Sequence, residues 1–199
     1  PNDVDLCTDA TPDEQMEIYQ AANVRHIATG LQHGTITVVL GGETYEITSL
    51  RRDAETDGRH ATVVYTRDWL VDLERRDFTI NAIAWDPLTD VYEDPTGGGA
   101  DLARRLLRVV DASTFGDDSL RVLRAVQFAA RFNFTLDAET RDICRAVPLD
   151  DLPAERVWGE FEKLLNAPKP SIGLTLALDL GVVDSLFPEL RALVGCPQE

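Results

Sequence analysis

The spacing of hydrophobic residues changes partway along the chain, and this change limits the possible folds more than any other feature. Up to about residue 112, short β-branched runs alternate with turn residues, which is typical of mixed α/β structure. Beyond residue 113 the apolar residues recur every three to four positions, which predicts helices at 117–132, 138–147, 154–165 and 171–180. The sequence therefore predicts an α+β chain with two domains, 1–112 and 113–199.

The composition narrows the class of protein and of partner. The chain has 199 residues, of which 44% are hydrophobic, and no run approaches the roughly 18 apolar residues of a membrane span. Its 35 acidic and 19 basic residues give a formal net charge of −16, which argues against nonspecific binding of DNA and other polyanions. Cys7, Cys144 and Cys196 are too far apart for a disulfide framework or a zinc knuckle. We expect a cytoplasmic protein with neither a membrane nor a DNA partner.

Local signals place several elements in the first domain. Residues 11–14, TPDE, supply a helix N-cap, a proline for the first helical position and the acid of a capping box. Residues 35–50 alternate apolar and polar side chains around a Gly-Gly pair, which predicts a β-hairpin with Glu46 on the polar face. The polar segment 51–60 predicts a mobile loop, and the glycine-rich segment 94–99 predicts a flexible break. Further elements are expected at 62–65, 69–75 and 82–85.

The first residues contain a candidate metal site. Asp3 and Asp5 flank one apolar residue, so their carboxylates lie on the same side of an extended strand. With Glu46 from a neighbouring strand, they would form the three carboxylates that two-metal phosphoryl transfer requires. A D-x-D pattern also occurs by chance along the solvated edge of an acidic protein. An EF-hand is excluded, because Cys7 and Thr8 would fill the fifth and sixth loop positions.

A second cluster, ERRDFTINA at residues 74–82, gathers charged, hydroxyl and amide side chains at the end of a predicted helix. The guanidinium of Arg76 matches the geometry of phosphate oxygens, and Asn81 can hydrogen-bond a ribose or a phosphate. The alternative is a surface ion-pair cluster in which Arg75 and Arg76 pair with the neighbouring acids. The residues by themselves leave both interpretations open.

A third cluster, GDDSLRVLR at residues 116–124, opens the first helix of the second domain. At 100° per residue, Asp118, Arg121 and Arg124 step along one side of that helix, while its leucines and valines turn to the other. A carboxylate accepts from an exocyclic amino group and a guanidinium donates to ring acceptors, so such a pair can read a base edge without a nucleic-acid template. Ion pairing along the helix is the alternative.

In their order and spacing, these clusters resemble class II CCA-adding tRNA nucleotidyltransferases and the related bacterial poly(A) polymerases. The resemblance covers nearly the whole chain and rests on DVDLCTDATPDE, HGTITVVLGGETYEITSLRRDAETDGRH, ERRDFTINAIA, DPTGGGADLARRLLR, FGDDSLRVLRAVQFAARFNF and ERVWGEFEKLL. It implies a polymerase-β-like nucleotidyltransferase head at 1–112 and an all-helical neck at 113–199. The implied reaction transfers CMP or AMP from CTP or ATP to the tRNA 3′ end and releases diphosphate.

The resemblance also implies a role for each candidate residue. The catalytic acids, of which the first two would bind two Mg²⁺ ions, are Asp3, Asp5 and Glu46. The nucleotide-binding residues are Arg76, Asn81, Asp118, Arg121 and Arg124. Among these, Asp118 and Arg121 would pair with the base of C or A, and Arg124 would lie beside the triphosphate. The flexible loop that helps the site switch from C to A would contain Arg52, Asp53, Asp57 and Arg59.

The chain departs from the family pattern at two places. The glycine motif that precedes D-x-D is absent because the sequence begins at Pro1, so we expect the head to be incomplete at its N-terminus. Gln127 stands where many relatives have an arginine. We expect an enzyme that builds or repairs the tRNA 3′-CCA end. The alternatives are a poly(A) polymerase or dedicated A-adding enzyme, and, in another class, a noncatalytic nucleotide- or RNA-binding fragment.

Overall fold

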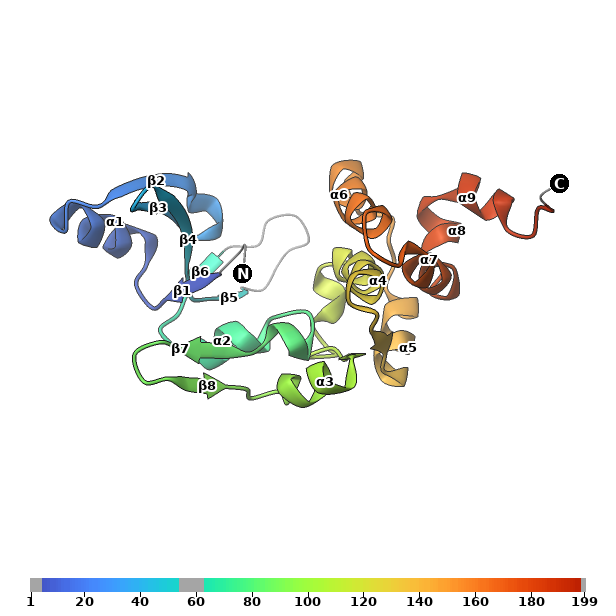
Figure 1. Cartoon of the computed structure of the whole chain (residues 1–199), viewed down its shortest axis with the longest axis horizontal. Coiled ribbons are helices and arrows are strands. Elements are labelled where there is room, and N and C mark those ends of the chain that lie inside the picture. The colour runs from blue at the N-terminus through green and yellow to red at the C-terminus, as the bar shows by residue number, and fades with distance from the viewer. Residues whose placement is uncertain (1–4, 54–62, 198–199) are drawn as a thin grey trace. The chain divides into compact units, whose positions relative to one another are not determined.

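The computed structural model of the chain describes residues 5–53 and 63–197 (Figure 1). Its contacts divide the chain into two compact units, which are unit 1, Pro1–Arg75, and unit 2, Arg76–Glu199. Unit 1 has mixed α/β structure and unit 2 is mainly helical, in agreement with the predicted α+β class.

Unit 1 is built on a four-stranded sheet of order β1-β4-β3-β2. Its strands are β1 (Leu6–Thr8), β2 (Arg25–Gly30), β3 (Thr35–Leu40) and β4 (Glu43–Ser49). Strand β1 pairs in parallel with β4, whereas β3 pairs antiparallel with both β2 and β4. The other elements are α1 (Pro12–Ala21), η1 (Leu31–His33), β5 (Arg51–Asp53), β6 (Val63–Tyr65) and α2 (Trp69–Glu74).

The predicted helix start and hairpin turn are confirmed in unit 1. The side chain of Thr11 accepts the backbone N–H of Glu14 at 3.4 Å, and the Glu14 carboxylate accepts the N–H of Thr11 at 2.8 Å, which completes the capping box of α1. Gly41 and Gly42 join β3 to β4 with φ values of 62° and 91°, a conformation that glycine adopts without strain. Local sequence therefore determines both features.

The two faces of this sheet differ in character. Ile36 and Val38 of β3 are buried, and on the same side Gln15 of α1 donates to the hydroxyl of Ser49 at 2.8 Å. Because side chains alternate along a strand, Glu46 lies on the opposite face, where it is exposed and faces Thr37 across the β3–β4 pair. Helix α1 thus lies against one face of the sheet (Figure 1), and Glu46 lies on the other.

Unit 2 contains short elements followed by a helical region. The short elements are η2 (Thr79–Asn81), β7 (Ala84–Asp86), β8 (Val91–Glu93), α3 (Gly98–Arg104), β9 (Leu106–Leu107) and η3 (Phe115–Asp117). The later elements are α4 (Leu120–Phe132), β10 (Thr135–Leu136), α5 (Ala138–Ala146), α6 (Ala154–Leu165), α7 (Pro170–Asp179), α8 (Val182–Leu186) and α9 (Pro188–Leu193). The four predicted helices correspond to α4–α7. The short helices α3, α8 and α9 span too few residues for a clear hydrophobic period.

Helix α4 is the central helix of unit 2 and packs against both α6 and α7. Its leucine and valine side chains are buried, as the period predicts. Phe78 and Leu107, which precede the helical region, belong to the same hydrophobic core as α4. The compact unit therefore begins at Arg76, whereas the domain boundary between 112 and 113 stays a prediction.

Residues 94–99 form a packed helix start instead of the expected flexible break. The backbone N–H groups of Gly98 and Gly99 donate to the carboxylate of Asp94 at 2.6 and 2.9 Å, at the beginning of α3. A Cβ atom on Gly98 would lie only 2.0 Å from the carbonyl oxygen of Thr79. Glycine serves here for close packing of α3 against the η2 turn.

All three cysteines lie in the described part of the chain and are free thiols. Burial raises the pKa of the Cys144 thiol to about 12, so this group stays protonated near neutral pH. No helix among residues 5–53 and 63–197 is long and apolar enough to cross a membrane.

Candidate functional site

The candidate catalytic acids belong to unit 1. Leu6 of β1 lies opposite Ile47 of β4 in the parallel pair. Continuing this register by one residue places Asp5 beside Glu46, on neighbouring chains of the sheet. Both residues are exposed. Asp3 lies outside the described residues, so two of the three predicted acids come together at the start of β1 and in β4.

These two acids suit a magnesium ion. Mg²⁺ prefers oxygen ligands and is commonly held by one or two carboxylates together with substrate phosphates. Within residues 5–53 and 63–197, no group of three or more histidine, cysteine, aspartate or glutamate side chains is placed to hold a metal. The described pair fits the predicted site in donor type, and the complete two-metal site stays a prediction.

The buried carboxylate of Asp77 contacts two of the predicted nucleotide-binding residues of unit 2. Asp77 is 7% exposed. Its Oδ1 accepts from Nδ2 of Asn81 at 2.9 Å and from the backbone N–H of Phe78 at 2.8 Å. Its Oδ2 accepts from Nε of Arg124 at 2.6 Å. Asp77 thereby holds together two predicted nucleotide-binding residues that are far apart in the sequence.

The two neighbouring arginines of this segment have different partners. Arg76 donates from its NH1 to the backbone carbonyl of Asn81 at 3.1 Å, which closes the turn that follows Asp77. Arg75 forms an ion pair with Asp72 at 2.7 Å within unit 1. The ion-pair interpretation is thus confirmed for Arg75, and the nucleotide-binding role of Arg76 stays a prediction.

The η2 turn that carries Asn81 is held in place by a second buried acid. Asp101 of α3 is 2% exposed and accepts from the hydroxyl of Thr79 at 2.7 Å and from Nε of Arg108 at 2.8 Å. The backbone N–H of Thr79 donates to the carbonyl of Arg108 at 2.9 Å. Since buried polar groups are costly unless they are paired, this network resists displacement of the turn.

The predicted base-reading pair is arranged differently from the helical expectation. Helix α4 begins at Leu120, and Asp118 lies before it with an extended backbone at φ −131° and ψ 97°. The helical period therefore does not set the position of the Asp118 side chain, and that part of the prediction is wrong. Arg121 does lie on α4, where its NH1 donates to the backbone carbonyl of Thr114 at 3.1 Å.

The structure describes only part of the predicted flexible loop, and it describes the position of Gln127 fully. Arg52 and Asp53 lie in β5, which pairs antiparallel with β6, so the base of the predicted flexible loop is a short β-ladder. Asp57 and Arg59 lie outside the described residues. Gln127, which replaces an arginine of the family pattern, is 1% exposed within α4 and therefore belongs to the core of unit 2.

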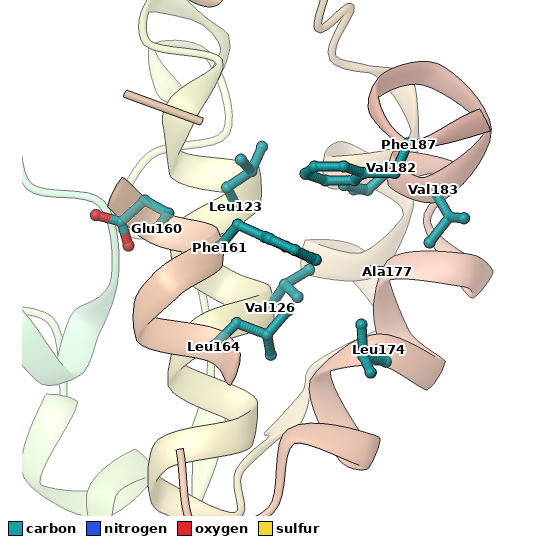
Figure 2. A pocket seen from close by; sticks show the side chains of 10 residues that line it. All are labelled: Leu123, Val126, Glu160, Phe161, Leu164, Leu174, Ala177, Val182, Val183 and Phe187. Atoms are coloured by element: carbon teal, nitrogen blue, oxygen red, sulfur yellow. The ribbon is translucent and has the colours of Figure 1, made fainter. Parts of the chain in front are cut away.

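One small cavity among the helices of unit 2 is unsuited to a nucleotide. Ten side chains from α4, α6, α7 and α8 and from Phe187 line it (Figure 2). Its volume is about 10 Å³, on the order of the space for one water molecule. Glu160 is also a lining residue, and Figure 2 shows its carboxylate pointing away from the apolar side chains. The candidate site therefore rests on the polar side chains described above.

Comparison with known proteins identifies the family. The family described as Poly A polymerase head domain matches residues 1–108, and the one described as Probable RNA and SrmB- binding site of polymerase A matches residues 133–193. A CCA-adding enzyme of Geobacillus sp. (strain WCH70) is 39% identical over 186 residues, which are 90% of this chain and 45% of that protein.

Two solved structures show the same similarity. The Bacillus stearothermophilus CCA-adding enzyme in complex with CTP has a TM-score of 0.78 and 36% identity, and the match covers 88% of this chain and 42% of that one. A tRNA nucleotidyltransferase complexed with a primer tRNA and an incoming ATP analog has a TM-score of 0.76 and 27% identity, over 93% and 54% of the two chains. This chain spans less than half the length of the curated relatives it matches. Because the head-domain match covers more than half of its residues, the chain belongs to the poly A polymerase head domain family.

Proposed function

We propose that the protein containing this chain adds CMP and AMP from CTP and ATP to the tRNA 3′ end, without a nucleic-acid template. The observation that carries the proposal is the Asp77 carboxylate, which joins Asn81 and Arg124 into one polar cluster. Support also comes from the similar proteins, which include a CCA-adding enzyme, a CCA-adding enzyme in complex with CTP, and a tRNA nucleotidyltransferase complexed with a primer tRNA and an incoming ATP analog.

In the proposed reaction, the tRNA 3′-hydroxyl gives up its proton to water and its oxygen bonds to the α-phosphorus of the nucleotide. The bond between the α-phosphorus and the oxygen that bridges to the β-phosphate breaks, and diphosphate leaves with that oxygen. Asp5 and Glu46, together with Asp3, would hold Mg²⁺, which when bound neutralises charge on the attacking and leaving oxygens. Arg124 would donate to triphosphate oxygens, and Asn81 to the ribose or a phosphate. Because Asp77 already fixes both side chains, nucleotide binding would require little further ordering of them.

In this proposal, Asp118 and Arg121 select the incoming nucleotide by its base. Cytosine and adenine each carry an exocyclic amino group, which a carboxylate can accept, and ring nitrogens to which a guanidinium can donate. Uracil and guanine present a carbonyl oxygen at the corresponding place, and its lone pairs repel a carboxylate. A site with these two groups would therefore favour CTP and ATP without a complementary strand.

The proposal is tested by incorporation of radiolabelled CTP and ATP, separately and together, into tRNA that lacks its CCA end. The protein is produced from the complete reading frame that contains this sequence. Addition of CMP followed by AMP is expected. Extension by ATP alone would instead indicate a poly(A) polymerase or an A-adding enzyme, which tRNA already ending in CC would distinguish by the number of A residues added. Absence of Mg²⁺-dependent incorporation would favour a noncatalytic binding protein.

Arg121→Ala is expected to relax nucleotide choice. Losing one charge-assisted hydrogen bond to the base should reduce the preference for CTP over UTP about tenfold and leave the Mg²⁺ concentration dependence unchanged. The measurement is kcat/KM for the four nucleotides on the same tRNA. Arg131→Ala on the same helix is the matched control, because Arg131 is exposed and its guanidinium lies over Phe132. An unchanged preference in Arg121→Ala would contradict the base-reading role.

A further inference from the structure

The carboxylate of Asp118 is oriented by one local contact and one contact from a distant helix. Asp118 has an extended backbone between η3 and α4. Its Oδ1 accepts the backbone N–H of Leu120 at 3.2 Å, and its Oδ2 accepts from NH2 of Arg156 at 2.9 Å. The Leu120 contact is local, whereas Arg156 lies 38 residues further along the chain, in the first turn of α6.

The next residue is tied to the same part of the chain. Ser119, which is buried, donates its hydroxyl to Oδ1 of Asp151 at 2.7 Å. Asp151 lies just before α6, so two consecutive residues, Asp118 and Ser119, are held by the segment 151–156. Arg121 is held instead by the Thr114 carbonyl, on the other side of the η3 turn. The Thr114 contact of Arg121 thus involves a different partner from the described contacts of Asp118.

We propose that Arg156 is a positioning residue for nucleotide choice, which acts by fixing the orientation of the Asp118 carboxylate. This inference rests on the proposed function. An ionised carboxylate has about four acceptor positions. The contact with Leu120 occupies one acceptor position on Oδ1 of Asp118, and the contact with Arg156 occupies one on Oδ2. Acceptor positions therefore remain for the amino group of a base.

Loss of Arg156 is expected to affect the choice of nucleotide for a geometric reason. Discrimination between an amino group and a carbonyl oxygen requires the acceptor to be held at a defined position, because a carboxylate that rotates freely can turn away from a repulsive partner. Without Arg156, the long-range contact on Oδ2 is lost and only the Leu120 N–H remains. Binding of CTP and ATP would weaken, and rejection of UTP and GTP would weaken with it.

Arg156 can be replaced without opening the core. Its side chain is 47% exposed, and exposed ion pairs contribute little to stability. Arg145 of α5 is a matched control, since its side chain is 43% exposed and it pairs with Asp179 and Asp142, which belong to neither the base-reading nor the metal-binding candidates. The two alanine variants remove the same charge from the same unit and differ in the carboxylate that is released.

The experiment compares kcat/KM for CTP, UTP, ATP and GTP in the protein from the complete reading frame. Arg156→Ala is expected to reduce the CTP:UTP and ATP:GTP preferences about tenfold, and Arg145→Ala is expected to leave them unchanged. Arg156→Lys, which keeps one cationic donor, should restore part of the preference. Circular dichroism should show the same unfolding temperature for both alanine variants to within a few degrees.

The double variant with Asp118→Ala tests whether Arg156 acts through Asp118. In that background, Arg156→Ala should cause no further loss of preference, because the carboxylate it orients is absent. An additional loss in the double variant, or an unchanged preference in Arg156→Ala alone, would overturn the inference while the proposed function stands. If the unmodified protein incorporates no nucleotide, the proposed function itself fails.

Discussion

Asp5→Ala is expected to abolish nucleotide transfer, with a fall in kcat of about 10³-fold or more, while the protein stays folded. Extending the register of β1 on β4 by one residue places Asp5 beside Glu46, where the two carboxylates would share a metal ion with the substrate phosphates. Removing one ligand removes several kcal/mol of charge stabilisation in the transition state. Single-turnover transfer of CMP to tRNA measures the effect, and it avoids contributions from product release.

The control for this variant is Asp13→Ala. Asp13 is an exposed acid in the first turn of α1, so the replacement makes the same change in net charge at a distance from the acidic pair. It should keep full transfer activity. Both variants should unfold within about 0.5 kcal/mol of the unmodified protein, because the two side chains are exposed. Retained transfer in Asp5→Ala would contradict the metal-binding role.

Gly98→Ala is expected to destabilise the protein by about 3 kcal/mol or more and to raise KM for both nucleotides. The added Cβ would lie 2.0 Å from the carbonyl oxygen and 2.6 Å from the carbonyl carbon of Thr79. Since these are backbone atoms of the η2 turn, relief of the clash must move α3 or the turn that carries Asn81. Denaturant unfolding measures the first effect and nucleotide titration the second.

Gly159→Ala, a glycine replacement in the same unit, is expected to stabilise the protein instead. Gly159 lies inside α6, and a Cβ at this position meets no atom within 4 Å. Alanine there should stabilise the protein by about 0.5–1 kcal/mol, because it restricts the unfolded chain and favours the helix. If Gly98→Ala matched the stability of the unmodified protein, the close packing of α3 on the η2 turn would be wrong.

The elements that the sequence predicted well depend on interactions between near neighbours. The capping box of α1 joins Thr11 to Glu14, and the hairpin turn needs only the paired glycines at its centre. The helix expected at 154–165 has the same bounds as α6, because an amphipathic period extends along its whole length. Each of these signals is complete within a short stretch of chain, so it can be read before any tertiary contact is known.

The site was predicted in its residue types and only partly in its arrangement. The family resemblance implied nucleotide binding at Arg76 and Asn81, yet the pattern between Arg75 and Asn81 gave no reason to single out Asp77 among several nearby acids. The helical period similarly grouped Asp118 with Arg121, although Asp118 lies outside α4. The partner that fixes each carboxylate comes from a helix further along the chain, which is α4 for Asp77 and α6 for Asp118.

The sequence by itself determined the change from mixed to helical structure, the main helices and the chemical groups of the site, because these follow from local propensity and hydrophobic period. Only the tertiary structure decided which of those groups meet. The contacts of Asp77 with Arg124 and of Asp118 with Arg156 join residues 47 and 38 positions apart. Such contacts form where packed elements bring polar groups out of water, and a partially buried carboxylate is stable there only if folding also supplies its hydrogen-bond donors.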